Sequence, residues 1–205
     1  IVLGKAAERK KMVRQVDLKH IWKLFHPRSI AFVGASSKIG KWGHIMYAGV
    51  VAGKYQGAIY LVNATGGEIA GRKVYSSVAE IPESVDLAVV TVPADKILSL
   101  IPQFKEKGIR NVLIITSGFS EIGSEGKVLE EELVQKAREA GIVIVGPNTM
   151  GICNPYISFY CIGSHVRPPA GGTSLLAQSG NLGTQLLAFA AQEDIGIRAY
   201  CGSGN

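Results

Sequence analysis

The sequence predicts an α/β fold in which helices cover both faces of a doubly wound, parallel sheet. From Ser29 onward, short β-branched runs that are apolar throughout alternate with segments of helical periodicity. Continuous apolar runs are typical of strands buried on both faces, and strand–helix–strand alternation of this length indicates right-handed crossovers between parallel strands. The segments that follow the runs are rich in Gly, Ser, Thr, Asn and Pro. Ligands of such sheets bind beyond the carboxyl ends of the strands, so these segments are the candidate site.

Five strands joined by helices are expected in the first sheet. Gly108 and Gly141 stand where helix C-caps belong, and Ser124 can cap the last helix. Pro102 falls inside the third helical pattern, so that helix is expected to be kinked or to begin late. The expected strands are 30–34, 58–62, 86–92, 111–116 and 142–145, and the expected helices are about 43–53, 77–81, 94–107 and 124–140.

The chain is expected to divide into four segments: 1–28, 29–151, 152–169 and 170–205. The third contains Asn-Pro, Gly-Ser and Pro-Pro and is interpreted as an irregular connector with a short strand near 157–161. The fourth predicts a second strand–helix–strand unit, with strands at 173–177 and 197–201 and a helix at about 182–193. These elements are too few to complete a sheet, so the sequence is expected to stop early in a second domain.

Composition and charge exclude several classes of protein. The net charge of +6 arises entirely in residues 1–28, because residues 29–205 carry fourteen basic and fourteen acidic side chains. The basic segment is interpreted as a solvated helix or tail, with a docking arm for an acidic partner as the alternative. No basic–aromatic interleaving predicts nucleic-acid binding, and no apolar run is long enough to span a membrane. Three widely spaced cysteines form no metal or disulfide pattern, which favours reduced thiols in a cytoplasmic protein.

The segment GASSKIGKWG, residues 34–43, follows the first strand and opens a helix, which is typical of an anion site. A Walker A loop is excluded, because Gly34 and Gly40 are one residue too far apart and Trp42 replaces the Mg²⁺-binding Ser or Thr. A dinucleotide fingerprint is poorly supported, because its second glycine is missing and Asn63, not an acid, ends the second strand. A phosphate-bearing nucleotide held by loop amides, hydroxyls and two lysines fits best.

Several ordered motifs carry a family resemblance: LFHPRSIAFVGASSKIGKWG, VNATGGEIAGRKVYSSVAEIPESVDLAVVTVPAD, SGFSEIGSEG, GPNTMGICNP and LLAQSGNLG. Together they resemble the CoA-binding domain of NDP-forming acyl-CoA synthetases, a family that includes ADP-forming acetyl-CoA synthetase and the α subunit of succinyl-CoA synthetase. The resemblance implies a Rossmann-like CoA-binding domain at 29–151 and the start of a flavodoxin-like, succinyl-CoA synthetase-like second domain at 170–205. It also implies the reaction acyl-CoA + NDP + phosphate ⇌ acid + CoA + NTP, through an acyl phosphate and a phosphohistidine.

The resemblance implies where CoA and acyl-CoA would bind. The loop from Ala35 to Lys38 would meet the pyrophosphate and the 3′-phosphate. Val92–Ala94 would hold the nucleotide and pantetheine, and Ser117–Phe119 would lie along the pantetheine arm. Asn148 and Gly151 would lie near the thiol. The full expected set is Gly34, Ala35, Ser36, Ser37, Lys38, Gly40, Lys41, Asn63, Val92, Pro93, Ala94, Ser117, Gly118, Phe119, Asn148 and Gly151. Ala64 stands where the family often has Pro, which alters the expected loop after the second strand.

None of the four histidines occupies the position that the resemblance implies for the phosphohistidine. Ser179, Gly180 and Asn181 would nevertheless contribute to the phosphate site at a helix N-terminus. The chain is therefore expected to bind CoA without catalysis and to hold no metal. An ATP-grasp subunit or domain would bind ADP, ATP and Mg²⁺, and an oligomer is possible. Two alternatives remain: a CoA-sensing regulatory domain of a protein acetyltransferase, and an NAD-binding redox sensor.

Overall fold

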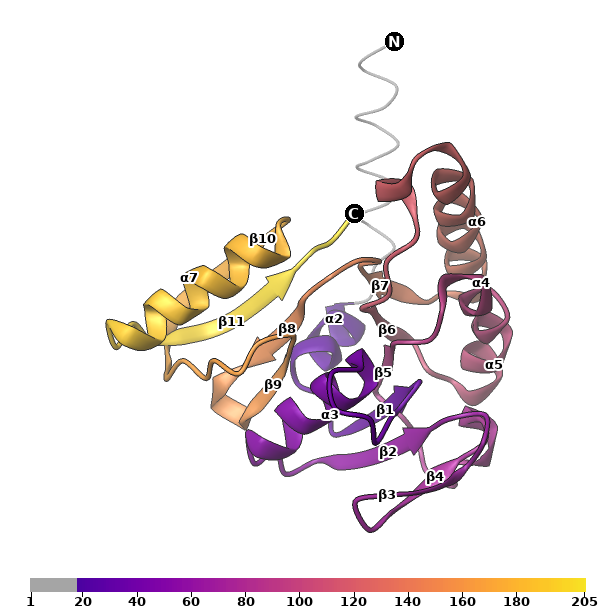
Figure 1. Ribbon diagram of the computed structural model, residues 1–205, viewed down its shortest axis with the longest axis horizontal. Helices are drawn as coiled ribbons and strands as arrows, with labels where there is room; N and C mark the ends of the chain where they lie inside the picture. The colour runs from indigo at the N-terminus through magenta and orange to yellow at the C-terminus, as the bar shows by residue number, and fades with distance from the viewer. Residues whose placement is uncertain (1–17) are drawn as a thin grey trace.

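The computed structural model describes residues 18–205, so most of the expected basic segment lies outside the described residues. Seven strands form the first sheet in the order β3-β4-β2-β1-β5-β6-β7 (Figure 1). Only the β3–β4 pair is antiparallel, and this hairpin was not predicted. The strands are β1 (Ser29–Val33), β2 (Ala58–Val62), β3 (Gly67–Ile69), β4 (Arg72–Tyr75), β5 (Leu87–Val90), β6 (Asn111–Ile114) and β7 (Val143–Val145). The winding reverses between β1 and β5, where a doubly wound sheet opens a binding crevice.

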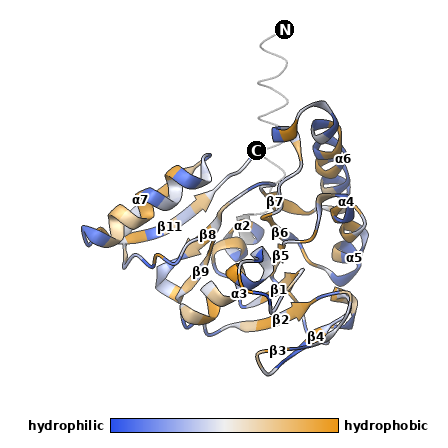
Figure 2. Ribbon diagram, viewed as in Figure 1, coloured by the Kyte–Doolittle hydropathy of each residue, from blue (hydrophilic) through white to orange (hydrophobic). Residues whose placement is uncertain are grey.

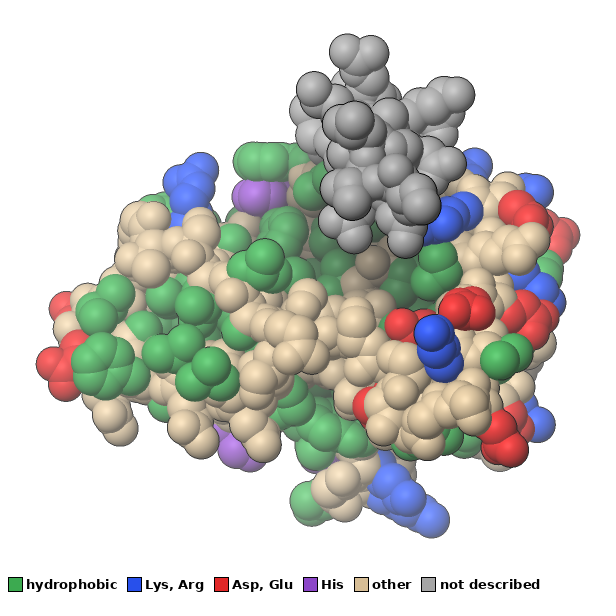
Figure 3. All heavy atoms as spheres, turned by 90° about the horizontal axis from the view of Figure 1, so that it is seen from above, with side chains coloured by type: hydrophobic (Ala, Val, Ile, Leu, Met, Phe, Trp, Pro, Cys, Tyr) green, Lys and Arg blue, Asp and Glu red, His purple; other side chains and the backbone are tan. Residues whose placement is uncertain are grey.

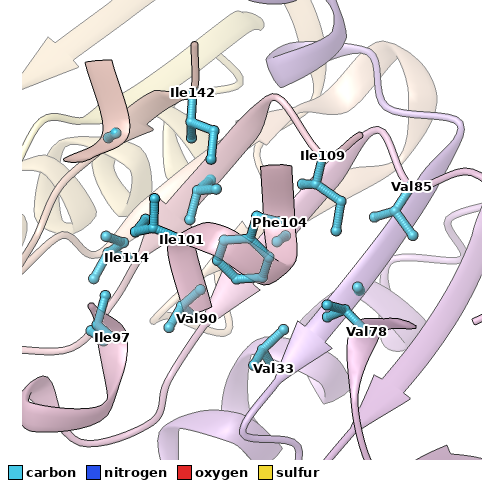
Figure 4. Close-up of a cluster of buried hydrophobic side chains, with 14 of the residues drawn as sticks. Val33, Val78, Val85, Val90, Ile97, Ile101, Phe104, Ile109, Ile114 and Ile142 are labelled. Carbon is cyan, nitrogen blue, oxygen red and sulfur yellow. The ribbon is translucent and has the colours of Figure 1, made fainter. Parts of the chain in front are cut away.

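Helices cover both faces of this sheet, as predicted. Ile30 and Phe32 of β1 pack into one hydrophobic cluster with α2 and α3. Ala31 and Val33 point to the opposite face, where they pack with η1, α4, α5 and α6 (Figure 4). The elements are α2 (Leu18–Phe25), α3 (Trp42–Ala52), the 3₁₀ turn η1 (Val78–Glu80), α4 (Ala94–Ile97), α5 (Leu100–Lys107), the 3₁₀ turn η2 (Ser120–Ile122) and α6 (Ser124–Ala140).

The expected helix ends are largely confirmed. Gly108 and Gly141 adopt left-handed conformations, with φ of 79° and 66°, directly after α5 and α6. The pattern at 94–107 is split into two helices, and Pro102 lies in the first turn of the second, where its missing N–H costs nothing. Two expectations were wrong. Ser124 is the first residue of α6 rather than its cap, and the helix expected at 77–81 is only the turn η1.

The second sheet is larger than predicted. Its order is β10-β11-β8-β9, in which β10 and β11 form the expected parallel pair and β8–β9 is an antiparallel hairpin. The expected connector therefore supplies two strands: β9 corresponds to the short strand expected near 157–161, whereas β8 was not expected. Asn154 accepts a hydrogen bond from the Tyr156 amide, so Asn-Pro forms the turn η3 inside the hairpin. The elements are β8 (Gly151–Asn154), η3 (Pro155–Ile157), β9 (Phe159–Ile162), β10 (Ala170–Ala177), α7 (Gly180–Gln192) and β11 (Ile197–Gly202).

The hairpin β8–β9 packs the second sheet onto the first. Ile152, Phe159 and Cys161 belong to the same hydrophobic cluster as α2 and α3. The side-chain amide of Asn154 donates to the Phe25 carbonyl at 3.0 Å, and a Cβ at Gly49 of α3 would lie 3.1 Å from the Tyr160 carbonyl oxygen. These contacts fix the position of the second sheet relative to the first. Within residues 18–205, no helix combines the length and apolarity needed to cross a membrane.

Candidate functional site

Two cavities lie among the loops that follow the strands. The first has a volume of about 580 Å³ and lies among the carboxyl ends of β1, β2 and β5. Four of the predicted residues line it: Gly34, Asn63, Val92 and Pro93. The second has a volume of about 380 Å³ and is lined by residues of both the first and the second sheet regions. A cavity is therefore present at the carboxyl edge, where the sequence predicts a crevice, and a second cavity lies where the loops of the two sheets meet.

Two glycines let the backbone pass closely at the first cavity. Gly34 has a φ of 97°, and a Cβ there would lie 2.7 Å from Thr91 Oγ1. Thr91 Oγ1 donates to the Gly34 carbonyl at 3.1 Å, which ties the end of β5 to the end of β1. A Cβ at Gly43 in the first turn of α3 would lie 2.0 Å from the Gly34 carbonyl oxygen. Gly34 was predicted as a site residue, whereas Thr91 and Gly43 belong to the segments that the sequence pattern singled out but were not predicted as site residues.

The amides of the predicted anion loop divide into two groups. Ala35 N–H donates to the Val62 carbonyl at 3.1 Å, and Lys38 N–H donates to Ser36 Oγ at 3.1 Å, so both are used by the protein. Within residues 18–205, the amides of Ser36, Ser37 and Gly40 have no acceptor. The loop from Ser37 to Lys41 is exposed, and Ile39 is 89% exposed. Free amides at an open helix N-terminus are the groups that bind phosphate oxygens.

Asn63 organises the first cavity through its side chain. Its Nδ2 donates to the Ala35 carbonyl at 2.8 Å, and its Oδ1 accepts from the amide and the hydroxyl of Thr65, each at 3.1 Å. The Asn63 amide also donates to the Tyr75 carbonyl. Because these groups are committed, Asn63 positions the loops after β1 and β2. This explains physically why an amide, rather than the acid of a dinucleotide site, ends β2.

The second cavity brings together residues that were predicted from three separate motifs. Ser117 follows β6, Asn148 follows β7, and Ser179–Asn181 begin α7. Trp42 and Met150 also line it. A Cβ at Gly180 would lie 2.2 Å from Met150 Cγ, so α7 starts in close contact with the loop after β7. Neither Trp42 nor Met150 was predicted as a site residue, because apolar side chains carry no chemical signal of their own.

The start of α7 has the features of an anion site. Ser179 Oγ caps the helix by accepting from the Leu182 amide at 3.3 Å. Within residues 18–205, the amides of Gly180 and Asn181 have no acceptor. The helix is 13 residues long, so its dipole adds positive potential to these free donors. The first-turn amides thus adjoin a cavity that Ser117 and Asn148 also line.

The loop after β6 is already occupied by a carboxylate. The Gly118 and Phe119 amides donate to Glu121, and Asn205 Nδ2 donates to both Glu121 and Glu130. Desolvation opposes ionisation, but the hydrogen bonds from Asn205 and the amides hold the pKa of Glu121 below its usual range. The Phe119 side chain is fully buried in the core. Of the three residues predicted here, only Ser117 therefore lines a cavity.

The remaining predicted residues lie outside the two cavities. Ala94 begins α4, and its Cβ would lie 3.3 Å from a Cβ at Gly118. Gly151 begins β8, where a Cβ would lie 2.0 Å from the Cys161 carbonyl oxygen, so its role in the fold is close packing. Among the described residues, no cluster of three metal-ligating side chains is found, and none of the described histidines lines either cavity.

Comparison with known proteins adds independent information. Residues 28–155 match the family of CoA binding domains. The chain is 41% identical over 186 residues to the acetate–CoA ligase (ADP-forming) I subunit alpha of Pyrococcus furiosus, and the match covers 89% of this chain and 40% of that protein. It is 39% identical over 182 residues to the corresponding II subunit alpha, with coverages of 88% and 39%.

The comparison with solved structures finds a similar protein. The dinucleotide forming acetyl-coenzyme A synthetase 1 of Ca. Korarchaeum cryptofilum, in complex with phosphate and ADP, matches with a TM-score of 0.84. Its sequence identity is 35%, over 89% of this chain and 39% of that chain. The chain thus spans about 40% of the length of the relatives that it matches.

Proposed function

The chain belongs to the family of CoA binding domains, and from this premise we propose that it is the CoA-binding part of an ADP-forming acyl-CoA synthetase. The overall reaction would be acyl-CoA + ADP + phosphate ⇌ acid + CoA + ATP. The observation that carries the proposal is the pair of cavities among the loops that follow the strands, one suited to a nucleotide and one to an anion. A reaction in which an acyl group passes between the thiol of CoA and a phosphate oxygen needs both.

CoA would occupy the first cavity and contact the loop after β1. The adenosine would occupy the first cavity, against Val92 and Pro93. The pyrophosphate would accept from the free amides of Ser36 and Ser37, with Lys38 as a cationic donor. Pantetheine would then run past Ser117 toward Asn148, so that the thiol reaches the second cavity. Of the loop's backbone donors, the Ala35 amide has no part in this arrangement, because Val62 already accepts from it.

The second cavity would hold the phosphoryl group that is transferred. Free amides of Gly180 and Asn181 and the hydroxyl of Ser179 would bind its oxygens at the start of α7. The histidine that carries the phosphoryl group, and the ATP-grasp module that binds ADP and Mg²⁺, would come from beyond the described residues. We therefore expect ligand binding from this chain and no turnover when it is assayed alone.

Calorimetric titration of the chain with CoA and with NADH tests the nucleotide assignment. We expect CoA to bind more tightly, because Asn63 is committed to the loops and no acid is available for a ribose hydroxyl at the end of β2. Tighter binding of NADH would contradict the proposal. Formation of ATP from acetyl-CoA, ADP and phosphate by the chain alone would contradict the expectation that the chain binds ligands but does not catalyse the reaction.

The anion assignment at α7 has its own measurement. Inorganic phosphate is added to isotopically labelled chain while amide chemical shifts are followed. The Gly180 and Asn181 amides should shift with a single saturable affinity, because they are the free donors of the second cavity. Alanine at Ser179 should weaken the cap and reduce the affinity. A response confined to residues outside the second cavity would show that α7 is not the phosphate site.

A further inference from the structure

The polar side chains of the first cavity are mostly committed to the protein. Thr91 Oγ1 donates to backbone carbonyls, and Ser76 Oγ donates to Glu80. Ser99 Oγ donates to the Lys96 carbonyl at 2.7 Å, and Gln103 Nε2 donates to the Ser99 carbonyl at 3.2 Å. Each of these groups, and Asn63 as well, thus has a donor engaged within the fold, and none of them carries a positive charge.

Lys96 is the exception. Among the described residues that line the first cavity, it supplies the one cationic group. The Lys96 ammonium pairs only with its neighbour Asp95, at 3.2 Å, and both side chains are more than two-thirds exposed. An exposed pair of this kind contributes little and is readily exchanged for another partner. The hydroxyl of Ser77, which also lines the cavity, makes no hydrogen bond within residues 18–205.

The two lysines that the sequence pattern emphasised lie elsewhere. Lys38 and Lys41 belong to the exposed loop after β1, and neither lines the first cavity. Walls of Val78, Pro93 and Leu100 make the cavity apolar around the expected nucleoside. A phosphate on that nucleoside would lose water on binding and would need a charged donor close at hand.

We propose that Lys96, assisted by the Ser77 hydroxyl, binds the 3′-phosphate on the ribose of CoA and sets the preference for CoA over 3′-dephospho-CoA. This inference rests on the proposed CoA site and makes it more specific. It moves the 3′-phosphate contact from the loop after β1 to the start of α4, and it leaves the pyrophosphate with the Ser36 and Ser37 amides and Lys38. Lys96 therefore sets ligand specificity and has no part in phosphoryl transfer.

The test measures the dissociation constants of CoA and of 3′-dephospho-CoA for a small set of variants. Lys96→Gln should weaken CoA binding by roughly tenfold, the lower range for a charge-assisted contact, and should leave dephospho-CoA almost unchanged. Lys96→Arg should retain the preference for CoA. Lys105→Gln is the matched control, because Lys105 is an exposed lysine of α5 that lines neither cavity. It removes the same charge and should leave the affinities for CoA and for 3′-dephospho-CoA unchanged.

The possible outcomes distinguish a failure of the Lys96 inference from a failure of the proposed CoA site. Equal losses for both ligands in Lys96→Gln would overturn the inference, because the lysine would then serve a shared part of the molecule. A loss of the preference for CoA in Lys38→Gln but not in Lys96→Gln would overturn it in favour of the loop. A wild-type chain that binds both ligands equally would overturn it while leaving the CoA site intact. A wild-type chain that binds neither would overturn the proposed function itself.

Discussion

At the scale of single residues, Asp86 anchors the end of the first sheet opposite the site. Its carboxylate accepts from Lys23 at 2.7 Å and from the Arg28 amide at 3.0 Å, and the residue is 7% exposed. Desolvation opposes ionisation, but the hydrogen bonds and charges of Lys23 and Arg28 hold the pKa of Asp86 below its usual range. One buried carboxylate thus connects α2 to the sheet.

This arrangement predicts how stability depends on pH. Because the Asp86 pKa is lower in the folded than in the unfolded chain, its contribution is full above the unfolded pKa of about 3.9 and is lost as pH falls through the folded pKa. Asp86→Asn should destabilise the chain by roughly 1–3 kcal/mol at pH 7. The free energy of unfolding of the variant should also fall less steeply as the pH is lowered. Urea unfolding at pH 7 and at stepwise lower pH measures both effects. An unchanged pH profile in the variant would exclude Asp86 as the group responsible.

The elements differ in how far their formation could be read from sequence. Helix α6 has the predicted bounds, because its periodicity and the capping Gly141 are both local signals. Of the hairpin β8–β9, only a short strand near 157–161 was predicted. Strand β8 was missed, because its pairing with β11 and its packing in the cluster with α2 and α3 are contacts distant in sequence. Local signals fix helix ends, whereas non-local packing decides which short apolar segments become strands.

The candidate site also combines features that the sequence could predict with features that depend on contacts distant in sequence. Ser117 and Asn148 could be expected to lie close together, because polar residues after neighbouring strands converge at one edge of a sheet. Ser179 follows a strand of the second sheet, and only the family resemblance indicated it. The commitment of Ala35 and Asn63 to hydrogen bonds within the protein could not, because the partners Val62 and Tyr75 are brought near only by the fold. Sequence reasoning therefore found the edge, and the structure shows which donors there remain free.

The close approach of α3 to β1 gives a prediction at the scale of elements. Gly43→Ala would place a methyl group 2.0 Å from the Gly34 carbonyl oxygen, so the helix must move away from the loop. Alanine gains about 1 kcal/mol in helix propensity, but the clash with backbone should outweigh this and give a net loss of roughly 1–3 kcal/mol. CoA affinity should fall as well, because the loop amides move with the helix.

Gly172→Ala provides the control, because a Cβ there meets no atom within 4 Å and the φ of Gly172 is not positive. Thermal unfolding and CoA titration should show it to be close to wild type. If Gly43→Ala were as stable as Gly172→Ala and bound CoA equally well, the close helix–loop contact would not be needed at the site.

At the scale of the whole molecule, the second sheet leaves an apolar helix face exposed. Leu182, Leu186 and Phe189 of α7 follow helical spacing and are 55%, 39% and 54% exposed. Figure 2 shows hydrophobic residues along this helix, and in Figure 3 hydrophobic side chains gather on the side of the molecule where α7 lies. Leu187 and Ala190, in contrast, are buried against the sheet. An apolar face of this kind on an isolated chain favours association.

The chain should therefore self-associate as its concentration rises, and a charge on the α7 face should suppress this. Leu186→Lys introduces the charge at the centre of the exposed face, whereas Gln185→Lys adds the same charge at an exposed polar position of α7. Light scattering coupled to size exclusion should show a lower average mass for Leu186→Lys only. Both variants should keep the wild-type affinity for CoA, because neither position lines a cavity. Equal association of both variants and the wild type would mean that another surface drives it.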